Sequence, residues 1–439
     1  MLTDPQALDP LVAALRAGER SPVSLIDHCT DRIDAAEGEV RALVPESARR
    51  SRLRREAEAL AARHDDPASR PALYGVPVGV KDIFHVDGFQ TRAGSSVPPA
   101  AITGRESVAV RRLLDAGALH VGKTHTAEFA YFEPAPTRNP HDLGHTPGGS
   151  SSGSAAAVAA GMCPLALGTQ TVGSVIRPAA FCGIVGFKPS YDRIPRDGVV
   201  TFSSTVDHVG TFTADVAGAE RAASVLCDGW EPVTADERPV LGVVEGPYLD
   251  QASSAGRAGL EAGVDALADA GYEVRRVAML DDIEAVNDRH DDLTGAELAL
   301  SHAERYAEYG DRFADPTADL IEASHDVGVG ELADARAAVR AFRSRVGDRM
   351  REHGVDLLLS PAAPGPAPSG IDDTGDPIMN LPWTHAGVPA LTVPCGRVGG
   401  LPLGLQAVAP FGADESLLAW GRDLANVVGD IGAVGDEGA

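Results

Sequence analysis

One lysine and two serines are placed where they could carry out nucleophilic chemistry together. Lys81 lies in an otherwise apolar run, Ser150 in a Gly/Ser-rich loop, and Ser174 in a second glycine-containing loop. Burial disfavours the charged form of a lysine, and a neutral amine can act as general base for a serine hydroxyl. An intervening serine can relay the proton, and backbone N–H groups near Ser174 can stabilise an oxyanion. The alternative is that Lys81 pairs with Asp82 and that both serines lie in ordinary turns.

Two further motifs match patterns of known catalytic or binding loops. Residues 117–124 fit GxxxxGK[ST], which binds phosphate when a strand precedes the loop and a helix follows it. Here a helical pattern ends at Gly117 and an apolar run follows, so a P-loop NTPase is disfavoured. Residues 149–153 fit GxSxG, the nucleophile elbow of α/β-hydrolases. The polar residues before it do not resemble the buried strand that the elbow requires, so this interpretation is also disfavoured.

Strand and helix patterns alternate along the segment that carries these residues. Apolar residues at three- and four-residue spacings predict helix over 6–65 and 107–116, and Gly117 is a typical helix-stop residue. The alternation predicts an α/β layered fold. The other expected elements are strands at 77–84, 118–122, 355–360 and 390–393, Gly/Ser-rich loops at 147–154 and 168–174, a helix at 155–160, and mostly helix over 215–355.

The composition excludes several classes of protein. The chain has 63 acidic and 38 basic residues, a net charge of −25, which argues against nucleic-acid and anionic-membrane binding and suggests a highly soluble surface. A saline cytoplasm is one explanation of the acidity, and composition alone does not establish it. Five scattered cysteines predict neither a disulfide framework nor a zinc site. The N-terminus does not resemble a secretory signal and no run of 18 apolar residues occurs, so we expect a cytoplasmic protein. Only three basic residues are lysines, at positions 81, 123 and 188.

Several motifs taken together resemble the amidase signature family over nearly the whole chain. Those around Ser150 and Ser174 are Gly148-Gly-Ser-Ser-Ser-Gly-Ser-Ala155, Gly168-Thr-Gln-Thr-Val-Gly-Ser174 and Arg177-Pro-Ala-Ala-Phe-Cys-Gly183. The others are Gly75-Val-Pro-Val-Gly-Val-Lys-Asp82, Gly122-Lys-Thr124 with Glu128-Phe129, Gly186-Phe-Lys-Pro189, Asp207-His-Val-Gly210, Gly387-Val-Pro-Ala-Leu-Thr-Val-Pro394 and Gly404-Leu-Gln406.

The resemblance implies one large α/β domain, residues 1–439, with a mixed, twisted sheet flanked by helices. Within it we expect an N-terminal helical part (1–65), a catalytic core (66–215), a mostly helical, substrate-shaping part (216–355) and C-terminal core strands with a helix (356–439).

The resemblance also implies roles for individual residues. Ser174 would be the nucleophile, Ser150 the bridging serine after a cis peptide, and Lys81 the base. The oxyanion hole would be formed by the amides of Thr171, Val172, Gly173 and Ser174.

Two of the departures from the common family pattern bear on substrate binding. Gln170 replaces a frequent aspartate, and Arg177 stands three residues after Ser174 instead of two. This arrangement resembles the malonamidase-like branch, in which the arginine holds the carboxylate of a small amide acid. Arg177 and Gln170 are therefore candidate substrate-binding residues. The alternative for Arg177 is a structural ion pair with a buried acid.

The expected activity is hydrolysis of a linear, non-peptide carboxamide through a Ser-Ser-Lys triad, with no cofactor or metal. The expected partner is a small-molecule amide, and a homodimer is the default assembly. One alternative is the glutaminase subunit of a tRNA-dependent amidotransferase, which would hand ammonia to companion subunits. A catalytically silent relative is disfavoured because Lys81, Ser150 and Ser174 are all present.

Overall fold

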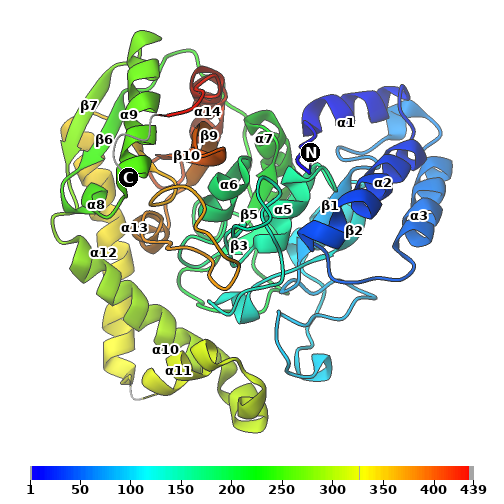
Figure 1. Ribbon diagram of the computed structural model, residues 1–439, viewed down its shortest axis with the longest axis horizontal. Helices are drawn as coiled ribbons and strands as arrows, with labels where there is room; N and C mark the ends of the chain where they lie inside the picture. The colour runs from blue at the N-terminus through cyan, green and yellow to red at the C-terminus, as the bar shows by residue number, and fades with distance from the viewer. Residues whose placement is uncertain (1, 326, 435–439) are drawn as a thin grey trace.

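A ten-stranded mixed β-sheet forms the centre of the molecule in a computed structural model that describes residues 2–325 and 327–434 (Figure 1). The two edges of the sheet are parallel, and the pairings between β3 and β8 are antiparallel. In sheet order the strands are β2 (Leu119–Thr124), β1 (Pro77–Lys81), β3 (Leu165–Gln170), β5 (His208–Thr213), β4 (Val185–Lys188), β9 (Ala390–Val398), β10 (Leu401–Val408), β8 (Leu357–Pro361), β6 (Leu241–Glu245) and β7 (Val274–Ala278). The predicted single α/β domain with a mixed sheet is confirmed.

The predicted N-terminal helical region consists of three helices beside the β1–β2 edge of the sheet (right of Figure 1). The second helix begins after Ser21, whose side chain accepts a hydrogen bond from the Ser24 N–H and so caps a free donor of the first turn. The helices are α1 (Leu8–Ala17), α2 (Pro22–Val40) and α3 (Arg49–Arg63).

The helices of the central region are short and deeply buried. All residues of α5 are buried, and a Cβ added at Gly153 would lie 2.2 Å from the Ala42 carbonyl oxygen. Such close packing explains why the segment after Ser150 is built from glycine, serine and alanine. Gly117 has φ +88°, as expected of a residue that ends a helix. The helices are α4 (Val108–Asp115), α5 (Ser152–Ala159), α6 (Ile176–Cys182) and α7 (Val216–Leu226).

The C-terminal half contains both sheet strands and a projecting helical arm. Helices α10 and α11 and part of α12 extend away from the sheet (lower left of Figure 1). The prediction that 215–355 is mostly helical is right for the helices but misses strands β6 and β7, which form one edge of the sheet. The helices are α8 (Pro247–Asp250), α9 (Ser254–Asp269), α10 (Ile283–Tyr309), α11 (Asp315–Ala323), α12 (Val329–His353), α13 (Leu381–Ala386) and α14 (Asp414–Val428), and one-turn 3-10 helices lie at Pro67–Ser69, Pro99–Ala101, Glu128–Ala130 and Gly310–Arg312.

Three predicted boundaries need correction because tertiary contacts set them. The strand expected over 77–84 ends at Lys81, the expected loop 168–174 begins with the last three residues of β3, and α5 begins at Ser152 instead of 155. All five cysteines are free and buried. None of the helices in the described residues is long and apolar enough to cross a membrane.

Candidate active site

Lys81 ends strand β1 with its ammonium group in the protein interior. The side chain has no exposed surface, and Nζ lies 2.8 Å from Ser150 Oγ and 2.8 Å from Thr169 Oγ1. Asp82 does not pair with it, because Asp82 Oδ1 binds Lys123 Nζ at 2.6 Å instead. Burial holds the pKa of Lys81 well below its ordinary value, and the nearby Asp207 carboxylate offsets part of that shift. The hydrogen-bond partners of Lys81 Nζ are therefore the hydroxyl groups of Ser150 and Thr169.

Ser150 connects the interior of the sheet with a small cavity. It follows a cis Gly149–Ser150 peptide, lies directly before α5, and is almost wholly buried. Its side chain contacts Lys81 on one side and lines the cavity on the other. The loop therefore gives Ser150 the position of an intermediate between the lysine and the cavity.

Ser174 lines the same cavity from the turn that follows β3. The cavity has a volume of about 20 Å³, so only a small group fits without movement of the walls. No hydrogen bond joins the hydroxyls of Ser150 and Ser174 among the described residues. The cavity is lined by Ala130, Tyr131, Phe132, Ser150, Thr171, Val172, Ser174, Arg177, Phe202 and Pro377.

The turn that leads to Ser174 is fixed from behind by side chains that do not line the cavity. Gln170 Oε1 accepts hydrogen bonds from the N–H groups of Val175 (2.8 Å) and Ile176 (2.9 Å). Its amide nitrogen donates to Thr384 Oγ1 at 2.8 Å, and that hydroxyl donates to the Val172 carbonyl at 2.6 Å. Gln170 thus holds the turn through hydrogen bonds of both its amide oxygen and its amide nitrogen.

Arg177 is a buried cation in the cavity wall, only 2% exposed. Its Nη2 donates to the Gly149 carbonyl at 2.7 Å and to Thr374 Oγ1 at 3.1 Å. Its Nε and Nη1 have no hydrogen-bond partner in the described part of the chain, and no ion pair there includes Arg177. Burial lowers its pKa to about 10, and the charges of Asp376 and Asp373 act against this shift. The structural ion pair considered for Arg177 is therefore not formed within the described residues.

The other two lysines belong to structural contacts. Lys123 lies on β2 and its Nζ binds Asp82, so residues 117–124 form a helix-to-strand turn and not a phosphate loop. Lys188 is wholly buried, and its Nζ donates to the carbonyl oxygens of Val388 (2.5 Å) and Pro189 (3.1 Å). No buried strand leads directly into residues 149–153, which follow a loop. The structure thus contradicts both the phosphate-loop interpretation of residues 117–124 and the nucleophile-elbow interpretation of residues 149–153.

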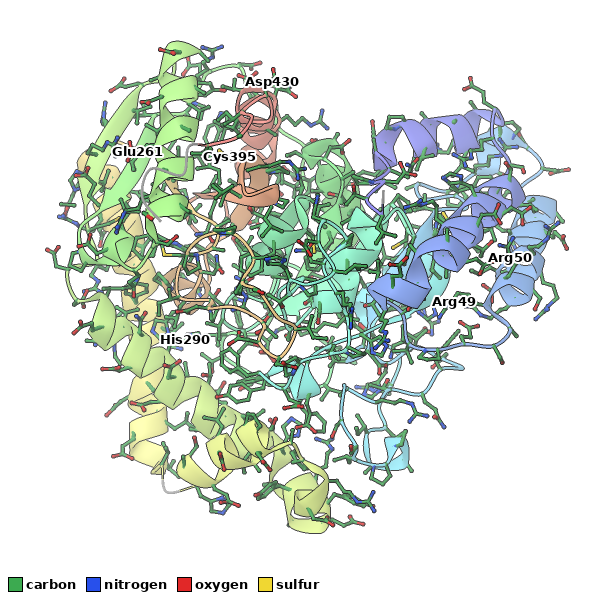
Figure 2. The ribbon with its side chains drawn as sticks, viewed as in Figure 1. Arg49, Arg50, Glu261, His290, Cys395 and Asp430 are labelled. Carbon is green, nitrogen blue, oxygen red and sulfur yellow. The ribbon has the colours of Figure 1, made fainter. Side chains whose placement is uncertain are left out.

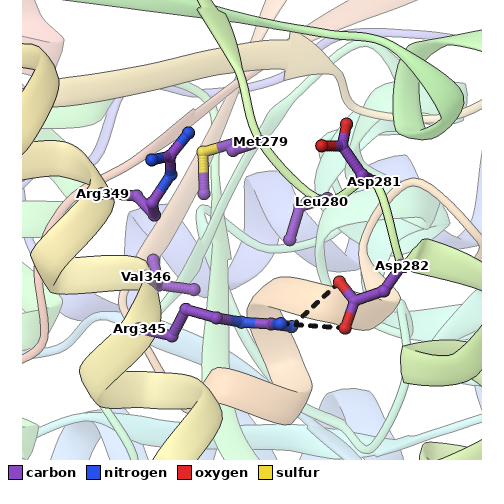
Figure 3. A pocket seen from close by; sticks show the side chains of 7 residues that line it. All are labelled: Met279, Leu280, Asp281, Asp282, Arg345, Val346 and Arg349. Carbon is purple, nitrogen blue, oxygen red and sulfur yellow. Dashed lines mark hydrogen bonds and ion pairs between the residues drawn. The ribbon is translucent and has the colours of Figure 1, made fainter.

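A larger hollow lies elsewhere on the molecule (Figure 3). It has a volume of about 480 Å³ and lies between the β7–α10 connection and α12. Its Arg345 binds both carboxylate oxygens of Asp282, at 2.8 and 3.1 Å. The hollow shares no lining residue with the Ser150–Ser174 cavity, so size does not identify the reactive site here. Among the described residues no group of three or more His, Cys, Asp or Glu could hold a metal ion.

Comparison with known proteins places the chain in a family. A family model described as Amidase matches residues 24–418. The chain belongs to the amidase signature family. One relative, a glutamyl-tRNA(Gln) amidotransferase subunit from Synechococcus sp. (strain RCC307), is 33% identical over 466 residues, covering 92% of this chain and 94% of the relative.

Solved structures of amidases share the fold along their whole length. One amidase structure has a TM-score of 0.89 at 32% identity and covers 96% of this chain and 100% of that one. The peptide amidase PAM in complex with the competitive inhibitor chymostatin has a TM-score of 0.82 at 26% identity, covering 96% and 97%. These likenesses support an amide-hydrolysing enzyme at the level of the family.

Several residues around the site were not singled out from the sequence. Thr169 contacts Lys81, and Asp207 accepts a hydrogen bond from Thr171 Oγ1 at 2.6 Å, with burial raising the Asp207 pKa to about 6. His290 Nε2 lies 3.0 Å from the Thr171 carbonyl oxygen. Asp207 carried a signal, since it opens the Asp207-His-Val-Gly210 motif, and Thr169 lies inside the serine loop motif. His290 had none, because it is 119 residues from Thr171.

Proposed function

We propose that this amidase-family chain cleaves the C–N bond of a small carboxamide through a covalent acyl-enzyme on Ser174. The observation that carries the proposal is the 2.8 Å contact between Lys81 Nζ and Ser150 Oγ, with Ser150 lining the same cavity as Ser174. A nucleophile needs a base within reach, either directly or through one relay group. Here Lys81 is the base and Ser150 is the relay group. The small cavity supports a substrate whose reactive end is compact.

In this proposal the proton of Ser174 passes through Ser150 to Lys81. Lys81 must be neutral to accept it, and burial favours the neutral amine by lowering its pKa. Rotation of the Ser174 side chain within the cavity brings its hydroxyl to Ser150, since apo contacts of catalytic groups commonly tighten on binding. The serine oxygen then attacks the carboxamide carbon. The same relay returns the proton to the leaving nitrogen, and water hydrolyses the ester that remains.

We assign stabilisation of the tetrahedral intermediate to the backbone amides of Thr171, Val172, Gly173 and Ser174. The hydrogen bonds of Gln170 and Thr384 support this assignment, because they fix the turn before any substrate is present. Fixed donors aimed at developing charge are among the largest contributors to catalysis. Gln170 then has a positioning role in the turn and no direct contact with substrate.

Arg177 supports a narrower substrate class, a small amide with a second, carboxylate end, as in the malonamidase-like branch. Its Nε and Nη1 are buried in the cavity wall without partners in the described residues. Each free N–H group of a guanidinium can donate a charge-assisted hydrogen bond to a carboxylate oxygen. A carboxylate at that position would accept hydrogen bonds from these two donors and balance the buried charge.

The second candidate function is that of an amidotransferase component that releases ammonia from glutamine. The relative from Synechococcus sp. supports it, because the match covers more than nine-tenths of both chains. It receives more direct support from the comparisons than a stand-alone amidase does. Both functions use the same acyl-enzyme chemistry, and glutamine also carries a carboxylate. They differ in whether the isolated chain turns over quickly.

A substrate panel on the purified chain separates these proposals. We expect Arg177→Ala to lower kcat/KM about 100-fold for amides with a second carboxylate, the loss of a charge-assisted pair, and about threefold or less for neutral amides. Thr374→Val is the matched control, because it removes one Arg177 partner and keeps the cation. Equal losses on both kinds of amide would contradict a carboxylate-binding Arg177. Rapid hydrolysis of malonic-acid monoamide without any companion protein would favour the stand-alone enzyme, whereas glutamine hydrolysis only with amidotransferase partners would favour the amidotransferase role.

A further inference from the structure

The carbonyl groups of the turn before Ser174 are held by two side chains from distant helices. His290 of α10 contacts the Thr171 carbonyl oxygen at 3.0 Å, and Thr384 of α13 donates to the Val172 carbonyl oxygen at 2.6 Å. The side chains of His290 and Thr384 are both buried, and neither lines the cavity. Figure 2 labels His290 on α10. The carbonyl groups of Thr171 and Val172 are therefore held in place by these two hydrogen bonds.

Because a peptide group is planar, holding these two carbonyl groups also fixes the direction of the N–H groups that follow them. In a trans peptide the C=O and the following N–H point in opposite directions. Fixing the Thr171 carbonyl toward α10 thus directs the Val172 N–H away from α10. Fixing the Val172 carbonyl toward α13 directs the Gly173 N–H in the same way. No acceptor for either N–H occurs among the described residues.

The contact with the Thr171 carbonyl determines the proton positions on His290 and, through it, on a second histidine, His385. His385 Nδ1 lies 3.2 Å from His290 Nδ1, with the two rings at 70° and their centroids 5.3 Å apart. A carbonyl oxygen only accepts, so His290 must carry its proton on Nε2. Its Nδ1 is then an acceptor, and His385 must donate from Nδ1. Burial keeps both rings neutral by lowering the pKa of His290 to about 3 and that of His385 to about 4.

The position of α10 is itself fixed by a buried carboxylate two turns further along the helix. Glu297 accepts hydrogen bonds from the Ser203 hydroxyl (2.5 Å), the Thr205 N–H (2.9 Å) and the Thr205 hydroxyl (2.6 Å). Arg336 of α12 donates to the same carboxylate at 2.6 Å. Because these bonds tie α10 to the loop before Asp207, His290 is presented to Thr171 by a rigid support.

We propose that His290 and His385 form a positioning relay that aims the Val172 N–H into the cavity, where it stabilises the oxyanion. The inference rests on the proposed function, because it presumes that Ser174 is the nucleophile. His290 touches no reacting atom in this account. Loss of the His290 imidazole should therefore change the rate of the covalent step at Ser174 and not the affinity for the molecule that reacts there.

The test uses an alkyl fluorophosphonate, which phosphonylates an active serine through an oxyanion-like transition state. For His290→Leu we expect the maximal rate of phosphonylation to fall about 10- to 100-fold, near the loss of one oxyanion donor, with the half-saturating concentration within about twofold. His290→Gln should recover the rate to within about threefold. Its amide offers one N–H donor for Thr171 and one carbonyl acceptor for His385, as the imidazole does.

The control for loss of a buried imidazole is His120→Leu. His120 is a buried residue on β2 whose ring nitrogens have no hydrogen-bond partner in the described residues. The phosphonylation rate of His120→Leu should equal that of the wild type. If His290→Leu fails to fold by circular dichroism, the pair His385→Leu and His385→Asn replaces it, since Asn keeps the donor to His290.

The outcomes separate this inference from the proposed function. A wild-type rate in His290→Leu, or a Gln variant no faster than the Leu variant, would overturn the relay while an unreactive Ser174→Ala left the nucleophile assignment standing. A change confined to the half-saturating concentration would also overturn it. Undiminished reaction of Ser174→Ala would overturn the proposed function instead.

Discussion

Lys81 and Lys188 end two strands of the same sheet, β1 and β4, and both side chains have no exposed surface. The hydrogen-bond partners of the two lysines differ. Lys81 Nζ contacts the hydroxyls of Ser150 and Thr169, which can donate or accept, whereas Lys188 Nζ contacts the carbonyl oxygens of Pro189 and Val388, which only accept. Burial lowers the pKa of both lysines, that of Lys188 to about 7. A depressed pKa therefore does not make a base without a proton donor in reach.

The strongest way to break this comparison is to remove each amine in turn. Lys81→Met should lower kcat about 10²–10⁴-fold, the usual contribution of a general base, with little change in the free energy of unfolding. Lys188→Met should keep kcat within about twofold but lower the unfolding free energy by about 1–3 kcal/mol, because two buried carbonyls lose their partner. Steady-state amide hydrolysis and urea unfolding measure the two effects. Equal kcat losses in both variants would show that the hydroxyl partners are irrelevant.

A pH profile sharpens the comparison through a smaller effect. The active form has a neutral Lys81, so kcat/KM should rise with pH up to the Lys81 pKa and fall about tenfold per pH unit below it. Burial lowers this pKa, so the limb should lie well below 10.5. The control is Lys188→Met, whose profile should have the same limb, since Lys188 takes no part in the reaction. A limb that disappears with Lys188, or a kcat/KM that rises as the pH falls, would contradict the assignment of the base.

The sequence contained most of the information on the reactive residues and little on what supports them. Lys81 stands out as one of three lysines in the chain, in an apolar run, and Ser150 and Ser174 stand in loops of small residues. Local composition reveals these residues because a neutral lysine needs apolar neighbours and a closely packed serine loop needs small ones, and both kinds of neighbour are adjacent in the sequence. The contacts of His290 with Thr171 and of Thr384 with Val172 join segments 119 and 212 residues apart, and only tertiary packing brings them together.

The fold was predictable where hydrophobic patterns were regular. The N-terminal helices followed from residue spacing, and strands β1 and β2 followed from short apolar runs, although the predicted second strand ended at Gly122, one residue before Lys123. Strands β6 and β7 did not, because each has five residues and lies between helices, and β7 is a sheet-edge strand with exposed Arg275 and Arg276. Such short segments have no strong period of their own, and their conformation is decided by pairing, of β6 with β8 and of β7 with β6.

The account depends most on Ser174 as the one residue that is covalently modified. Intact-protein mass spectrometry after treatment with an alkyl fluorophosphonate, followed by peptide mapping, tests this directly. We predict a single adduct on Ser174 in the wild type, the same adduct formed more slowly in Lys81→Met, and none in Ser174→Ala. An adduct on a different residue of the wild type, or undiminished labelling of Ser174→Ala, would contradict it.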